Sequence, residues 1–169
     1  MMRRRVLTVL AGLAVGGSFV AVARAAFGIA VTPSSVTSSA VTLNGVDRTS
    51  TFAAVFTVSG AGTTGWNITA WAPLPVSGAN TLGALVVATQ PTLGACSGTG
   101  CNLPVPTGIT WPVTLGTTSG TAAKIYNASA STGKVNNTVN ITFSIPVLAS
   151  ALPGTYTTTL TVIGSSTGP

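Results

Sequence analysis

Residues 135–147 read Val-Asn-Asn-Thr-Val-Asn-Ile-Thr-Phe-Ser-Ile-Pro-Val, and this stretch decides the fold class. Apolar residues occupy every second position from 139 to 147. Successive side chains of a β-strand point to opposite faces, so this alternation predicts a half-buried antiparallel strand with one apolar face. The residues expected on that face are Val139, Ile141, Phe143, Ile145 and Val147.

The next strand is predicted over residues 155–163, where Tyr156, Leu160 and Val162 share one face and Pro153-Gly154 supplies the turn before it. Shorter apolar or alternating runs separated by turn residues precede both strands. Together they favour an all-β fold, a single antiparallel β-sandwich or Greek-key domain. The further strands are expected at residues 27–31, 41–43, 51–59, 66–71, 82–89, 109–115 and 122–128.

Two further features of the sequence carry their own expectations. Pro112 cannot donate a backbone hydrogen bond, so it should confine its strand to a sheet edge. Residues 32–40 are rich in Ser and Thr, which is typical of a flexible neck.

The N-terminus has the three-part layout of a secretory signal peptide. Arg3, Arg4 and Arg5 precede an apolar run from Val6 to Val22, and small residues flank Arg24. We expect a signal peptide over residues 1–25, cleaved after Ala25, with the sandwich domain in residues 26–169. The alternative is that the run is retained as a membrane anchor, although it is short and rich in Ala and Gly for a spanning helix.

Cleavage would remove most of the positive charge. The chain carries seven basic residues, one acidic residue and a net charge of +6, and four of the basic residues lie in the predicted signal peptide. The remainder keeps Arg48, Lys124 and Lys134 against Asp47, a net charge of +2. With so few basic residues there is no patch to neutralise phosphates, so no nucleic-acid partner is expected. We expect the protein to contact the membrane only transiently, through the signal peptide.

The two cysteines are Cys96 and Cys101, separated by Ser-Gly-Thr-Gly. A close pair in an exported chain is typical of a structural disulfide. A metal site or cofactor is not expected, because the chain has no His and only one acidic residue.

The same residue counts argue against an enzyme. General acid–base chemistry needs His, a tuned carboxylate pair, or Lys or Tyr with a partner, and a Ser nucleophile needs a base. The chain has no His and no Glu, and Asp47 beside Arg48 is typical of a turn. No catalytic residue is therefore proposed.

Four aromatic residues are candidates for binding at the surface, because such side chains combine an apolar face with a polar group. They are Trp66, Trp71, Trp111 and Tyr156. Trp66 could be either a core residue or a residue that faces the cell wall. Trp71 lies five residues further along the same predicted strand, so its side chain should point to the opposite face. Trp71 and Trp111 are the favoured rim residues. Four glycosylation sequons are also present, at Asn67, Asn127, Asn136 and Asn140.

Residues 65–169 resemble the WxL-type domain of Gram-positive cell-surface proteins. Three pieces carry the resemblance: residues 65–70 (Gly-Trp-Asn-Ile-Thr-Ala), residues 124–128 (Lys-Ile-Tyr-Asn-Ala) with the Gly133 turn, and residues 145–161 with Pro-Gly-Thr-Tyr and alternating Thr. Ile68 replaces the motif leucine, and the distal Trp-x-Leu of the family is missing near Val162. The resemblance implies non-covalent attachment to the cell wall through peptidoglycan.

These observations lead to two functional expectations. The first is a secreted, extracellular, envelope-associated protein that binds cell-wall polymer or other envelope proteins without catalysis. The second is a self-associating pilus or matrix fibre subunit, in which residues 27–31 would complete the sheet of a neighbour.

Overall fold

A computed structural model of the chain describes residues 12–14 and 27–166. Within these residues the regular structure is almost entirely β-strand, and the exception is a single 3-10 turn, η1 (Ser119–Thr121). Antiparallel sheets pack on one another, which confirms the all-β sandwich prediction. The described part of the chain holds no helix with the length and apolar character needed to cross a membrane. Most of the predicted signal peptide lies outside the described residues.

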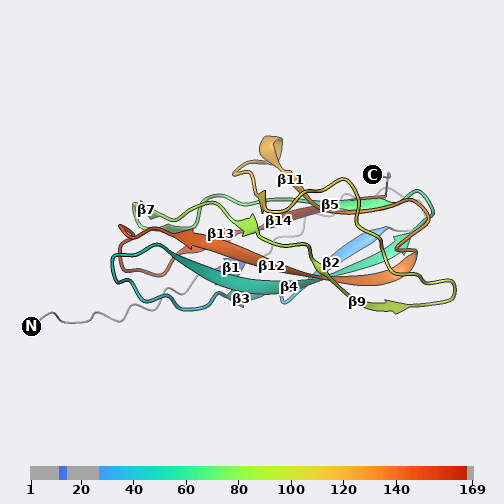
Figure 1. The fold of residues 1–169 in the computed structure, drawn as a ribbon, viewed down its shortest axis with the longest axis horizontal. Coiled ribbons are helices and arrows are strands. Elements are labelled where there is room, and N and C mark those ends of the chain that lie inside the picture. Colours follow the sequence, from blue (N-terminus) through green and yellow to red (C-terminus); the bar gives the residue numbers. More distant parts are fainter. Residues whose placement is uncertain (1–11, 15–26, 167–169) are drawn as a thin grey trace, which may run out of the picture.

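The larger layer is a six-stranded sheet built on two long strands, β4 (Arg48–Ala61) and β12 (Val135–Val147). They pair antiparallel along nearly their whole lengths, with Phe52 opposite Phe143, and they run along the long axis of the molecule (Figure 1). The other members are β2 (Gly28–Thr32) on β4, and β8 (Val86–Val87), β9 (Thr92–Ser97) and β10 (Val113–Thr114) on the β12 side.

The opposite layer is a three-stranded sheet in the order β11–β5–β14, with bounds Ala123–Ala128, Trp66–Trp71 and Thr161–Ser165. β5 is central and pairs antiparallel with both neighbours. Two of the segments that carry the resemblance to WxL-type domains, residues 65–70 and 124–128, thus lie in adjacent strands of this sheet, whereas the third ends at Thr161, the first residue of β14.

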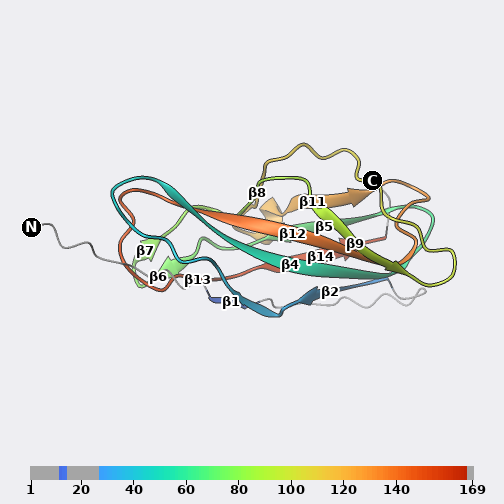
Figure 2. The same ribbon diagram turned by 60° about the horizontal axis from the view of Figure 1, so that its bottom comes forward.

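A third sheet lies at the side of the sandwich, in the order β3–β1–β13–β6–β7 (Figure 2). Its strands are short, and β1 comes from the N-terminal segment that the sequence assigns to the signal peptide. The bounds are β1 Gly12–Ala14, β3 Ser35–Thr37, β6 Val76–Ser77, β7 Asn80–Thr81 and β13 Thr157–Thr159.

The hydrophobic core lies between the two main layers. The predicted inner face of β12 is buried from Val139 to Val147, and so are Leu160, between β13 and β14, and Val162 in β14. Phe143 stacks on Phe52 at 5.1 Å between ring centroids and packs against Phe56 at 6.3 Å. The period-two pattern therefore identified the residues that hold the sheets together.

Several strand boundaries differ from the prediction. Residues 41–43 form no strand, although Val41 is buried in the core. Residues 82–89 and 109–115 shorten to β8 and β10, and residues 155–163 become β13 and β14, interrupted at Leu160. β10 lies at a sheet edge, as Pro112 predicted. Strand β9, which no sequence pattern indicated, pairs with β12.

The predicted flexible neck is wrong for residues 32–40. The segment contains β3, and the residues after it are tied to the start of β4. The Ser50 hydroxyl lies 2.7 Å from the Ser38 hydroxyl, and the Ser39 backbone N–H donates to the Thr51 carbonyl at 2.9 Å. Abundant hydroxyl side chains here serve hydrogen bonding within the fold.

Candidate binding surface

Trp66 is a core residue, which resolves the alternative that the sequence left open. It is fully buried on β5, and its ring stacks on Tyr126 of β11 at 5.3 Å between centroids. Its indole N–H donates to the Gly133 carbonyl at 2.9 Å. Because the ring is enclosed and its polar group is satisfied, the candidate role of Trp66 in surface binding is wrong.

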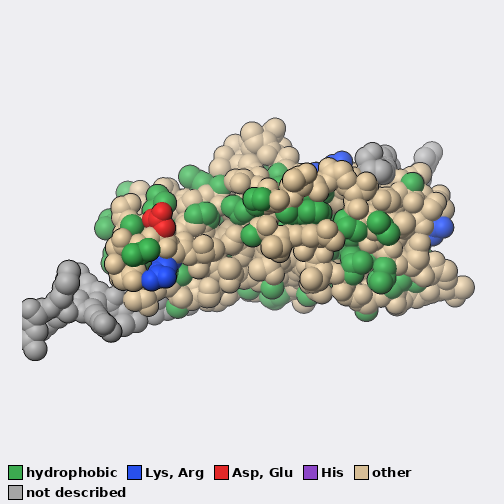
Figure 3. Space-filling model, in the orientation of Figure 1, with side chains coloured by type: hydrophobic (Ala, Val, Ile, Leu, Met, Phe, Trp, Pro, Cys, Tyr) green, Lys and Arg blue, Asp and Glu red, His purple; other side chains and the backbone are tan. Residues whose placement is uncertain are grey.

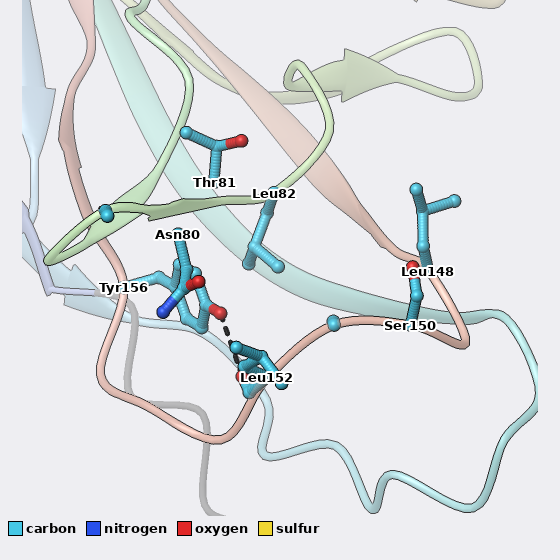
Figure 4. Close-up of a pocket in the computed structure, with 9 residues that line it drawn as sticks. Asn80, Thr81, Leu82, Leu148, Ser150, Leu152 and Tyr156 are labelled. Atoms are coloured by element: carbon cyan, nitrogen blue, oxygen red, sulfur yellow. Dashed lines mark hydrogen bonds between the residues drawn. The ribbon is translucent and has the colours of Figure 1, made fainter.

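Tyr156 is also buried, with 1% of its surface exposed. Its hydroxyl donates to the Leu152 carbonyl at 2.8 Å, which fixes the turn before β13 (Figure 4). The ring belongs to the apolar face that Tyr156 shares with Leu160 and Val162. It borders the pocket described below but has no open face at the outer surface, so its candidate role as an exposed surface-binding aromatic is wrong.

Trp71 and Trp111 keep part of their surface exposed, as expected for rim residues. Trp71 ends β5, and its outward position contrasts with the burial of Trp66, as their five-residue spacing predicted. A bridge joins Trp71 to Gly116, just beyond β10, and the Ala72 N–H donates to the Gly116 carbonyl at 3.0 Å. Trp111 packs partly against the core, and its buried indole nitrogen has no hydrogen-bond partner among the described residues.

A pocket of about 320 Å³ lies where the β6–β7 hairpin meets the turn before β13 (Figure 4). No charged side chain lines it. Leu148 and Leu152 are more than half exposed at its wall, beside the polar groups of Asn80 and Ser150. Such a lining suits an uncharged ligand with both apolar and hydrogen-bonding groups. No sequence motif indicated this pocket, because its residues come from two distant loops.

The surface is nearly free of charge. Figure 3 shows a face dominated by polar uncharged and apolar groups, with one acidic side chain near a basic one at one end. Asp47 has a structural role there, since its carboxylate accepts the Ala149 N–H at 2.7 Å and holds the turn that borders the pocket. Within the described residues, no group of three or more His, Cys, Asp or Glu side chains is placed to hold a metal ion.

Cys96 and Cys101 form the predicted disulfide. Cys96 lies in β9 opposite Asn137 of β12, and the Cys101 N–H donates to the Gly98 carbonyl at 3.2 Å. The bridge therefore closes the turn that follows β9.

Burial separates the four sequons. Asn127 is 3% exposed, and its amide donates to the Thr107 carbonyl at 3.0 Å, while Asn67 is 9% exposed. A glycan needs an accessible amide nitrogen, so neither of these two is a suitable acceptor in the folded protein. Asn136 is exposed and Asn140 is half-buried.

No family model, curated protein or solved structure matches this chain. Membership of the WxL-type family therefore stays a prediction that rests on the three sequence pieces quoted above.

Proposed function

We propose that this chain is a secreted, non-catalytic cell-surface protein that associates non-covalently with cell-wall polymer or with other surface proteins. The observation that carries the proposal is the nearly neutral surface, on which two partly exposed tryptophans, Trp71 and Trp111, are available for contact. Indole rings stack on the apolar faces of sugars without needing charge. Hydroxyl and amide side chains supply the remaining polar contacts.

The non-catalytic part of the proposal rests on the residue counts. The chain has no His and no Glu. Its one carboxylate, Asp47, accepts a backbone N–H at a turn. A hydrolase or transferase acting on wall polymer would need a general acid and a base, and this chain offers no such pair.

The test is sedimentation with isolated cell walls. We expect the exported protein to pellet with the walls, and Trp71→Ala or Trp111→Ala to move it toward the supernatant. Leu103→Ala, which removes an exposed aliphatic side chain, is the matched control and should pellet like the wild type. Walls stripped of protein distinguish polymer from protein partners. A protein that stays in the supernatant with both wall preparations would overturn the proposal.

A second candidate function is a self-assembling pilus or matrix fibre subunit. The observation that favours it is β1, a segment inserted as a central strand between β3 and β13. The proposed donor, residues 27–31, lies largely in β2 and is paired with β4 of the same chain. Electron microscopy of the exported protein tests this candidate: filaments that disappear when residues 27–31 are deleted support it, and their absence in the undeleted protein counts against it.

A further inference from the structure

β1 is paired along both of its edges. Gly12, Leu13 and Ala14 run antiparallel to β3, with Leu13 opposite Val36, and parallel to β13, with Leu13 opposite Thr158. We call the space between β3 and β13 the seam. In Figure 2 the seam lies along one side of the sandwich, near β2. A strand in this position is central in its sheet, so the backbone groups of both neighbours find partners.

The strand in the seam comes from the segment that the sequence predicts to be removed after export. Without residues 12–14, β3 loses the strand with which it pairs, and β13 keeps only the pairing of Thr157 with Val76. Two strand edges would then carry unsatisfied backbone donors and acceptors. Open edges of this kind bind an extended segment by adding it as a strand.

We propose that the seam is a strand-accepting site, filled by the chain's own residues 12–14 before cleavage and by the N-terminal segment of a second copy afterwards. The proposal rests on the second candidate function, because it names the site and the donor through which subunits would join.

The sequence supports this choice of donor. Residues 12–15 read Gly-Leu-Ala-Val and residues 28–31 read Gly-Ile-Ala-Val, which differ only by Leu against Ile. After cleavage at Ala25, the second of these stands close to the new N-terminus. A segment of the same pattern as the one seated in the seam is therefore available at the end of every subunit.

The number of strand edges without a partner also favours exchange of β2 between subunits. β2 is an edge strand that pairs with β4 alone over five positions, and Pro33-Ser34 joins it to β3. Among the edges that the exchange would change, three lack a strand partner in the cleaved, unexchanged subunit: those of β3 and β13 at the seam, and the outer edge of β2. When β2 enters the seam of a second copy, these edges gain partners and the edge of β4 that β2 leaves becomes open. A net charge of +2 opposes association only weakly.

The experiment begins with the complete chain, produced in a host that exports it. N-terminal sequencing of the released protein shows whether residues 12–14 have been removed. Light scattering after size-exclusion chromatography then gives its mass, and we expect a dimer or larger species. A synthetic peptide of residues 9–18 with a lysine tail should bind in a one-to-one complex and convert this species to monomers. The same peptide with Leu13→Pro, which lacks a backbone donor, should have no effect.

A chain variant tests the donor separately. Ile29→Pro disrupts the donated segment, so it should give a monomer that still binds the 9–18 peptide, and this binding also shows that the variant is folded. A cleaved wild-type protein that stays monomeric would overturn the second copy as occupant. One that also fails to bind the peptide would overturn the seam as a site. If filaments form in the presence of the peptide and in the Ile29→Pro variant, the fibre function would be supported, but the seam would not be the site through which subunits join.

Discussion

Gly133 offers a sharp test of how the core is held, because a single methyl group there should disturb the fully buried Trp66. The residue is buried in the turn before β12 with a φ of +64°. A Cβ there would lie 2.6 Å from the Trp66 indole nitrogen and 2.8 Å from the Pro104 Cβ. Its carbonyl also accepts the Trp66 N–H at 2.9 Å, so movement of either partner weakens that hydrogen bond.

The magnitude follows from these terms. The left-handed backbone costs alanine about 1 kcal/mol, and forcing a methyl group against the ring costs about 1–3 kcal/mol. Gly133→Ala should therefore lower the free energy of unfolding by about 2–4 kcal/mol. At roughly 3 °C per kcal/mol, this corresponds to a fall in Tm of about 6–12 °C.

The assay is urea unfolding followed by tryptophan fluorescence, with thermal unfolding by circular dichroism as a second probe. Gly120→Ala is the matched control, because a Cβ at Gly120 in η1 meets nothing within 4 Å. It should change stability by no more than about 0.5 kcal/mol. If Gly133→Ala is as stable as the wild type, or if both variants lose the same amount, the packing of Trp66 against this turn does not stabilise the fold as we argue.

Three further predictions concern stability. Replacing Cys96 and Cys101 by Ser should cost about 2 kcal/mol by the loop-entropy relation, and reducing agent should then have no further effect on the urea midpoint. Burial raises the pKa of the Tyr126 hydroxyl, so as pH rises the unfolded state loses this proton before the folded state does. The free energy of unfolding should therefore fall above about pH 10, by up to about 1.4 kcal/mol per pH unit. Tyr126→Phe should reduce this slope, measured by urea titrations at several pH values. Phe143→Ala removes a ring stacked on Phe52 and should cost about 3–5 kcal/mol in the same assay; a loss under 1 kcal/mol would contradict its place at the centre of the core.

Much of the fold follows from local pattern. Strict alternation along residues 139–147 has one good solution, a strand with its apolar side inward, and the burial of every second residue bears this out. The disulfide was also predictable from the sequence, because two close cysteines in a chain with a predicted signal peptide have few other uses. These features need no knowledge of which segment pairs with which.

The strand predictions are wrong where the available pairing partner decides whether a segment becomes a strand. Residues 41–43 have an apolar run and a following Asn44-Gly45 turn, but they pair with no strand. β2 covers only residues 55–59 of β4, and beside the start of β4 it is Ser39, before this run, that bonds to the Thr51 carbonyl. β9 contains Gly94 and polar residues, and it becomes a strand only because β12 extends beyond β8 and offers it an edge.

The candidate site was predictable in part. The spacing of Trp66 and Trp71 showed that one of them faces outward, but choosing the buried one depends on Tyr126 and Gly133, which come from distant segments. The pocket beside Tyr156 could not be predicted either, because its lining residues also come from distant segments. Single aromatic residues carry no signal of their own for core or surface, since both environments favour them.

The N-terminal segment shows a deeper ambiguity. A signal peptide needs an apolar run, and a strand between two others in a sheet also favours apolar residues, so Gly-Leu-Ala-Val satisfies both requirements. The pairing of β1 with β3 and β13 assigns residues 12–14 to the fold, whereas the arginines before them and the small residues around Arg24 predict their removal. The two assignments are compatible if the same seam first holds the leader and later a strand of like sequence. N-terminal sequencing of the exported protein separates a permanent strand from a replaceable one, because only a cleaved protein leaves the seam open.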